Sequence, residues 1–385
     1  MKVLISLLIF ALPAFGIFAA EEIDVTRIVM GGEKPLPVSM SGFSGEVDSV
    51  LRFDLAVLGL DFVTPEKAQY LISGRNNGGV EGRVLDAVSK QQLVVKAYSG
   101  ASARTLAHTL ANDFISAIRH SAPIFKSKVA FVVAQGRDAE IYVSDFDGHN
   151  ALPITHDNSL VKSPAWVPGQ LKLLYTSYKS GFADIFSHDL STGERRVFSH
   201  TPGDNFSPVV SRDGRRVAMI LTKGGSPDLY VADIDGSNLR QITNTKEDDE
   251  SSPCWSPDGQ KICFVSRYGG RAALYTIPAG GGERHRLNIV GALNATEPDW
   301  SPDGRTIVFT SQMGSFNICT VPASGGDATI LTEGEDPAWA ANSRTVVFTR
   351  RAGGRRVLSL LDAPTKRVKD LQQISGSCSQ PAWAK

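Results

Sequence analysis

A proline followed two residues later by a tryptophan recurs along the last two thirds of this chain of 385 residues. The motif contains every tryptophan of the sequence, in the pairs Pro164/Trp166, Pro253/Trp255, Pro298/Trp300, Pro337/Trp339 and Pro381/Trp383. A sixth copy, Pro208/Val210, carries valine instead. The steps between successive prolines are 44, 45, 45, 39 and 44 residues. A period of about 40–45 residues is typical of a β-propeller, in which each repeat forms one four-stranded blade.

The residues after each motif predict the other strands of a blade. Asp-Gly turns such as Asp258-Gly259 supply the positive φ that a tight hairpin needs. A β-rich segment then follows, expected at residues Lys172–Ser177, Arg216–Leu221, Lys261–Ser266, Thr306–Ser311 and Thr345–Arg350. A third strand, for example Asp228–Ala232, and a weaker fourth, for example Leu239–Ile242, complete the unit.

Two unmatched strands show how the ring closes. Lys128–Val133 has the second-strand pattern with no Pro-x-Trp strand before it, and Pro381–Trp383 has no second strand after it. Pairing these two completes a sixth blade and removes the open sheet edge of an unclosed ring. We therefore expect a mainly β protein in which residues 128–385 form a six-bladed propeller closed by the C-terminal strand.

The chain before the repeats has a different organisation. Residues 1–20 have the basic start, apolar stretch and small residues of an export signal, with an uncleaved anchor as the alternative. In residues 21–127, apolar positions from Glu46 onward and in Ala103–Arg119 have helical spacing, and Val80–Val88 with Gln91–Ser99 predicts a hairpin. A small α/β domain is expected there.

Charge and cysteine content limit the classes of partner. Lys plus Arg equals Asp plus Glu, at 40 each, so no net positive field favours nucleic acid. Cys254 and Cys263 flank a turn and are expected either as a disulfide or as buried thiols, with the thiols favoured. Cys319 and Cys378 have no evident partner. We expect an exported, soluble, monomeric protein.

The sequence contains no pattern typical of a catalytic or metal site. The seven histidines form no HxH or HxxxH pair, and no nucleophile elbow or phosphate-binding loop occurs. Asp145 and Asp147 resemble the start of a calcium loop but lack its later glutamate, so a turn is favoured. The tryptophans are expected to pack between blades, although aromatic rings facing the channel remain an alternative. No catalytic residue, cofactor or metal ligand is predicted.

Several segments resemble the TolB family, periplasmic propeller proteins of the Tol-Pal system of Gram-negative envelopes. The most specific are Tyr142–Asn150 and the Ser163–Trp166 repeat, together with the Trp-Ser-Pro-Asp-Gly repeats and the closing Gln380–Trp383. The order of an export signal, an α/β domain with a His108-Thr-Leu helix and six blades also matches. The resemblance implies protein binding without catalysis, in support of outer-membrane integrity and cell division.

The resemblance also implies two interaction sites. A Pal-like peptidoglycan-associated lipoprotein is expected at the loops that enter the Pro-x-Trp strands, which hold Asp204, Asn205, Ser207, Glu250, Ser251, Ser252, Asn294, Thr296 and Glu297. A TolA-like inner-membrane protein is expected to bind the N-terminal segment, whose alternating pattern suits strand addition. Its residues are Glu21, Glu22, Ile23, Asp24, Val25, Thr26, Arg27 and Ile28.

Two other functions remain open from the residues alone. A propeller enzyme of the lactonase or glycosidase type would need a metal or a carboxylate cluster in the channel. A periplasmic solute-binding propeller would hold a small ligand in the same cavity.

Overall fold

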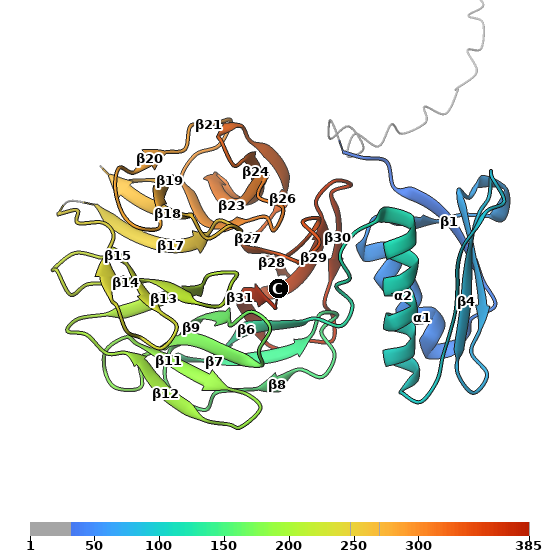
Figure 1. The fold of residues 1–385 in the computed structure, drawn as a ribbon, viewed down its shortest axis with the longest axis horizontal. Coiled ribbons are helices and arrows are strands. Elements are labelled where there is room, and N and C mark those ends of the chain that lie inside the picture. The colour runs from blue at the N-terminus through green and yellow to red at the C-terminus, as the bar shows by residue number, and fades with distance from the viewer. Residues whose placement is uncertain (1–31, 247, 269, 385) are drawn as a thin grey trace, which may run out of the picture. The chain divides into compact units, whose positions relative to one another are not determined.

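The computed structural model describes residues 32–246, 248–268 and 270–384. The predicted export signal and the segment Glu21–Ile28 lie outside these residues. Figure 1 shows the sheets of the propeller arranged around a central axis, and two helices beside a separate sheet.

The first part of the described chain is a five-stranded sheet with two helices. Its strands are β1 (Leu36–Ser41), β2 (Leu60–Phe62), β3 (Tyr70–Arg75), β4 (Val80–Asp86) and β5 (Gln92–Tyr98), in the order β2-β1-β3-β4-β5. The helices are α1 (Gly45–Val57) and α2 (Ala103–Arg119), and Pro65–Lys67 forms a 3-10 turn. β1 pairs in parallel with β2 and β3, and the other pairs are antiparallel.

Helix α2 has the bounds that its sequence predicts. Ser102 caps it by accepting a hydrogen bond from the Thr105 N–H, and His120 ends it in the left-handed conformation. Its apolar face packs closely on β4 at Gly82, where a Cβ atom would lie 2.6 Å from Leu110 and 2.7 Å from Phe114. Glycine at this position therefore sets the distance between helix and sheet.

Six four-stranded sheets follow, and these are the blades of the propeller. In each blade the first strand named lies next to the channel and the fourth lies at the outside. Blade 1 contains β31 (Ser377–Trp383), β6 (Lys128–Gln135), β7 (Asp138–Asp145) and β8 (Leu152–Pro153). Blade 2 contains β9 (Val161–Trp166), β10 (Lys172–Ser177), β11 (Asp184–Asp189) and β12 (Arg195–Ser199). Blade 3 contains β13 (Asn205–Val210), β14 (Arg216–Leu221), β15 (Asp228–Asp233) and β16 (Arg240–Gln241).

The remaining blades repeat this plan. Blade 4 contains β17 (Asp249–Trp255), β18 (Lys261–Tyr268), β19 (Arg271–Pro278) and β20 (His285–Arg286). Blade 5 contains β22 (Ala295–Trp300), β23 (Thr306–Met313), β24 (Ser315–Pro322) and β26 (Thr329–Glu333). Blade 6 contains β27 (Glu335–Trp339), β28 (Thr345–Ala352), β29 (Arg355–Asp362) and β30 (Arg367–Asp370). An additional pair joins β21 (Ile289–Val290) to β25 (Gly326–Asp327).

The predicted fold class is confirmed, including the closure of the ring. β31 pairs antiparallel with β6, with Cys378 opposite Val133 and Trp383 opposite Val129. The innermost strand of blade 1 is thus the last strand of the chain.

The cysteine pair that flanks the turn lies in direct register. Cys254 of β17 is the partner of Cys263 of β18, and both are buried thiols, as favoured from the sequence.

Candidate functional site

All six innermost strands begin at one end of the channel, which we call the mouth. At the residue that precedes the proline of each repeat, the backbone adopts left-handed φ values between 48° and 56°. These residues are Ser163, Ser207, Ser252, Glu297, Asp336 and Gln380. At the same place each innermost strand slips in register against its neighbour, which is the mark of a β-bulge.

The bulges direct backbone N–H groups toward the preceding blade. Asp336 N donates to Glu297 Oε2 (2.8 Å), Gln380 N donates to Asp336 Oδ2 (3.0 Å), and Ser163 N donates to Gln380 Oε1 (2.9 Å). A chain of hydrogen bonds therefore links blades 5, 6, 1 and 2 around the channel. Left-handed backbone in non-glycine residues costs roughly 1 kcal/mol or more each, and such strained residues often cluster where a protein binds its partners.

Two carboxylates meet within this ring. Glu297 also accepts a hydrogen bond from Thr310 Oγ1 (2.6 Å), and Asp336 accepts one from Thr349 Oγ1 (3.2 Å). Burial, together with the nearby charges of Glu297 and Glu335, raises the pKa of Asp336 to about 7. Asp336 therefore retains its proton over much of the acidic range.

Asp336→Asn is expected to raise the melting temperature at pH 8.5 and to have little effect at pH 4. The folded-state pKa lies above its ordinary value of 3.8, so the parent loses stability as pH rises from about 4 through 7, whereas asparagine does not ionise. The hydrogen bonds from Thr349 Oγ1 and Gln380 N both go to a single oxygen, Oδ2, which an amide oxygen can replace. Calorimetry at the two pH values tests this, with the exposed Glu283→Gln as control. An equal effect at both pH values would contradict it.

The mouth also carries exposed apolar side chains on the connections around it. Leu160 directly precedes β9, and Leu293 lies two residues before β22. Phe182 lies in the β10–β11 connection, and Phe316 is the second residue of β24. Their exposed fractions are 37%, 64%, 68% and 42%, respectively. Backbone hydrogen bonds hold these segments at the mouth: Tyr178 N donates to Leu160 O, Gly334 N to Phe316 O, and Gln312 N to Leu293 O. Next to Phe182, Ala183 N donates to Asp204 Oδ1 at 3.2 Å.

Most of the predicted lipoprotein-binding residues lie at the start of innermost strands rather than in the loops before them. Only Asp204 and Asn294 precede their strands. Seven of the predicted residues lie at the mouth and are at least partly exposed to solvent: Asp204, Ser207, Ser251, Ser252, Asn294, Thr296 and Glu297. Several of them, with Phe316 and Glu335, line a pocket of about 380 Å³.

Two predicted contact residues are instead buried. Asn205 has no exposed surface and accepts hydrogen bonds from Ser199 and Thr201. Glu250 is 1% exposed, accepts from Leu229 N (3.2 Å) and from Thr243, and lies 3.6 Å from Arg284; burial raises its pKa to about 7. These side chains hold loops and blades together, so they offer little surface to a partner.

Sequence reasoning missed three members of the ring and the apolar side chains. Ser163, Asp336 and Gln380 occupy the same position as Ser207, Ser252 and Glu297, directly before the repeat proline, so the repeat alignment contained that signal. The exposure of Leu160, Phe182 and Phe316 has no comparable signal, because apolar residues in short strands and loops are usually buried.

The tryptophans lie at the opposite end of the channel, and two of them bond the backbone of a neighbouring blade. Trp166 Nε1 donates to Ala382 O (3.0 Å) in blade 1, and Trp255 Nε1 donates to Val209 O (3.1 Å) in blade 3. Their exposed fractions are 7% and 8%. This geometry agrees with the packing role that the sequence favours, although four of the five also line a pocket of about 240 Å³ there.

A buried charged cluster joins α2 to the propeller. His108 Nδ1 lies 2.7 Å from Asp54 Oδ2 in α1, and His108 Nε2 lies 3.2 Å from Asp147 Oδ2, which follows β7; Arg104 of α2 also bonds Asp147. Although burial alone lowers it, the carboxylates of Asp147 and Asp54 raise the pKa of His108 to about 9. Burial raises the pKa of Asp54 to about 7. The family-specific segment Tyr142–Asn150 therefore meets the helix that contains His108 in this cluster.

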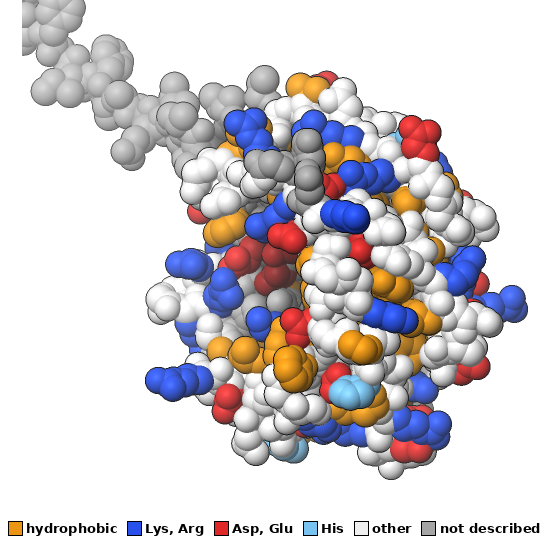
Figure 2. All heavy atoms as spheres, turned by 90° about the vertical axis from the view of Figure 1, so that its left-hand side faces the viewer, with side chains coloured by type: hydrophobic (Ala, Val, Ile, Leu, Met, Phe, Trp, Pro, Cys, Tyr) orange, Lys and Arg blue, Asp and Glu red, His pale blue; other side chains and the backbone are white. Residues whose placement is uncertain are grey.

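Within the described ranges, no three His, Cys, Asp or Glu side chains are placed to hold a metal ion. Across that same part of the chain, no helix has an apolar stretch long enough to cross a bilayer. The face drawn in Figure 2 carries basic and acidic side chains interspersed rather than a field of one sign, in agreement with the balanced composition.

Comparison with known proteins gives a consistent result. A family model described as PD40, TolB beta propeller domain, matches residues 117–385. Tol-Pal system protein TolB of Anaeromyxobacter dehalogenans is 30% identical over 275 residues, which cover 61% of this chain and 63% of the relative. Tol-Pal system protein TolB of Francisella tularensis is 26% identical over 283 residues, which cover 63% of this chain and 64% of the relative. The matches thus span less than two thirds of these relatives.

Solved structures extend the similarity in fold to the N-terminal part. TolB from Acinetobacter baumannii matches with a TM-score of 0.83 over 92% of this chain and 98% of that chain, at 21% sequence identity. At this identity the match shows a common fold.

Proposed function

Because the chain belongs to the TolB β-propeller family, we propose that it is a non-catalytic, periplasmic protein-binding component of a Tol-Pal system. In this role its mouth binds a Pal-like peptidoglycan-associated lipoprotein, and residues 21–28 bind a TolA-like inner-membrane protein. The two contacts together support outer-membrane integrity and cell division.

The observation that carries the mouth assignment is the ring of strained polar residues with exposed apolar side chains around it. Strained backbone fixes the polar groups before a partner arrives, which lowers the entropy lost on binding. Exposed aromatic residues such as Phe182 and Phe316 are the kind of side chain that dominates protein interfaces. A partly open pocket beside Phe316 gives a partner side chain a place to insert.

Phe182→Ser/Phe316→Ser is expected to weaken binding of the Pal-like periplasmic domain about tenfold or more, since losing an aromatic contact typically costs about 2 kcal/mol. Isothermal titration calorimetry measures the dissociation constant. The matched control is Leu152→Ser/Val197→Ser, at 63% and 54% exposure on the outermost strands β8 and β12.

The same assay separates the two contacts. Deleting residues 21–28 is expected to leave lipoprotein binding intact and to abolish binding of the TolA-like domain. Unchanged affinity in the phenylalanine variant, or equal loss in the control, would overturn the mouth assignment.

A further inference from the structure

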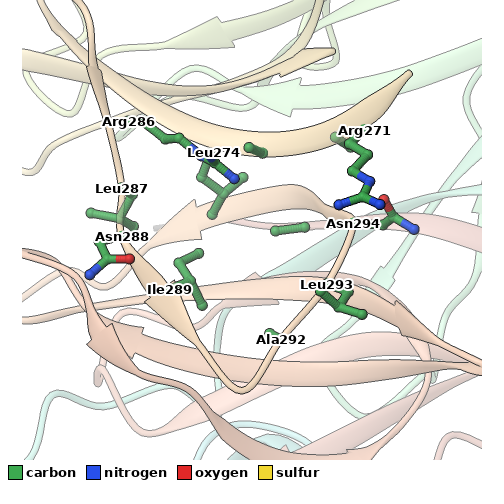
Figure 3. A pocket seen from close by; sticks show the side chains of 12 residues that line it. Arg271, Leu274, Arg286, Leu287, Asn288, Ile289, Ala292, Leu293 and Asn294 are labelled. Atoms are coloured by element: carbon green, nitrogen blue, oxygen red, sulfur yellow. The ribbon is translucent and has the colours of Figure 1, made fainter. Parts of the chain in front are cut away.

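A groove of about 430 Å³ lies between blades 4 and 5, outside the channel (Figure 3). Its floor is apolar: Leu274 of β19 and Leu287 are 0% and 7% exposed, and Ile289 of β21 is partly buried. Leu293, 64% exposed, stands at its edge. The groove continues toward the mouth, because Ala272 and Asn294 line both this groove and the mouth pocket.

Two arginines flank the apolar floor. Figure 3 shows Arg286 and Arg271 at different ends of the upper wall, with Arg271 beside Asn294. Both are exposed, and neither forms an ion pair or side-chain hydrogen bond with another described residue. Arg284, two residues from Arg286, is in contrast paired with Asp248 at 2.6 Å. Among the described residues, no acidic side chain lines the groove, so its two guanidinium groups are available to an external anion.

The wall opposite the arginines is held in place before any ligand arrives. β21 pairs with β25 through Gly326 N to Asn288 O and Ala328 N to Val290 O, each 2.8 Å. At the mouth end, Ser311 Oγ donates to Leu293 O (2.8 Å) and accepts from Leu293 N (3.1 Å). A fixed groove loses less entropy on binding than one that must first order.

The register of blade 4 sets the spacing of the two arginine backbones. Arg286 lies opposite Tyr275, four residues beyond Arg271 along β19. At about 3.3 Å per residue, the two backbones are ~13 Å apart, the distance that four residues of an extended peptide span. In such a peptide, residues i, i+2 and i+4 point to the same side. The matching sequence is acidic at i and i+4 with an apolar residue at i+2.

We propose that this groove binds an extended segment of a protein partner with the pattern acidic–x–apolar–x–acidic. The two carboxylates pair with Arg271 and Arg286, and the apolar side chain lies on Leu274, Leu287 and Ile289. That this segment belongs to the partner bound at the mouth rests on the proposed function. Guanidinium–carboxylate pairing gives the contact its charge selectivity.

A fluorescein-labelled peptide, Ser-Glu-Ser-Leu-Ser-Glu-Ser, tests the groove directly by fluorescence anisotropy with the mature full-length chain. The peptide is expected to bind in 25 mM NaCl and to bind much more weakly in 300 mM NaCl, because exposed ion pairs are screened. Replacing its glutamates by lysine, or its leucine by serine, is expected to abolish binding.

The double variant Arg271→Glu/Arg286→Glu is expected to weaken binding of the peptide at least tenfold. The matched control, Arg215→Glu/Arg240→Glu, makes the same charge change at exposed arginines of blade 3, and is expected to bind normally. Equal binding by parent and groove variant, or equal loss in the control, would overturn the proposal.

Further measurements distinguish this proposal from the mouth assignment and from a lipid surface. If the lipoprotein still binds but the peptide does not, the groove proposal is wrong and the mouth assignment stands. If the peptide binds but the lipoprotein does not, the proposed function is wrong and the groove proposal stands. Flotation with phosphatidylglycerol vesicles that depends on Arg271 and Arg286, with no peptide binding, would replace the peptide segment by an anionic membrane.

Discussion

A chain that ends after Gly376 is expected to lose cooperative folding of the propeller. The truncation removes β31, the innermost strand of blade 1, and exposes the edge of β6 along the channel. It also removes Trp383, 3% exposed, whose Nε1 donates to Ser127 Oγ at 2.6 Å. Without β31, the edge of β6 has no partner strand, which favours aggregation.

Circular dichroism during thermal unfolding and size-exclusion chromatography measure this effect. We expect a broad transition or aggregated material, compared with a sharp transition for a chain shortened by Lys385 alone. A truncated chain that stays monomeric and unfolds cooperatively near the parent's melting temperature would show that the ring does not depend on β31.

Asp147→Asn is expected to lower the free energy of unfolding by about 3 kcal/mol, the usual cost of removing one member of a buried ion pair. The change leaves Arg104 and His108 without the carboxylate that bonds both of them across the contact between α2 and the propeller. The matched control, Asp145→Asn, lies two residues away and pairs with Lys128 at 2.8 Å on a partly exposed surface. Such a pair contributes at most about 1 kcal/mol.

The effect of Asp147→Asn is also expected to depend on pH. The pKa of His108 rises from its ordinary value of 6.5 to about 9 in the folded protein. The stability that the charged imidazole of His108 contributes is therefore present in full below about pH 6.5 and is lost as pH rises through 9. Urea unfolding at pH 7 and pH 10 is expected to show a larger loss at pH 7. Equal losses for Asp147→Asn and Asp145→Asn would contradict the role of the cluster.

The sequence predicted the repeated architecture because periodic features carry it. The spacing of the Pro-x-Trp motifs gave the blades, and the unmatched strand Lys128–Val133 gave the closure by residues 381–383. The apolar face of α2 gave the bounds Ala103–Arg119 without correction. Strands such as β2 and β21 were missed, since three or two residues carry no periodic pattern.

The site was harder to predict because burial and pairing depend on distant residues. Nothing near Glu250 in the sequence indicates that it bonds Leu229 N and Thr243 of the neighbouring blade. Likewise, Arg284 and Arg286 look alike in sequence, but of the two only Arg284 has an acidic partner among the residues that the structure describes. The left-handed backbone before each proline coincides with a β-bulge of the innermost strand, which no residue pattern in the sequence indicated.

Site-specific photocrosslinking in the cell envelope tests the central claim most directly. Benzoylphenylalanine at position 182, at the mouth, is expected to form an adduct with the Pal-like lipoprotein, and the same group at position 152, on the outermost strand of blade 1, is not. Both positions are more than 60% exposed in the parent protein. An adduct from position 152 and none from position 182 would contradict the assignment of the mouth as the binding surface.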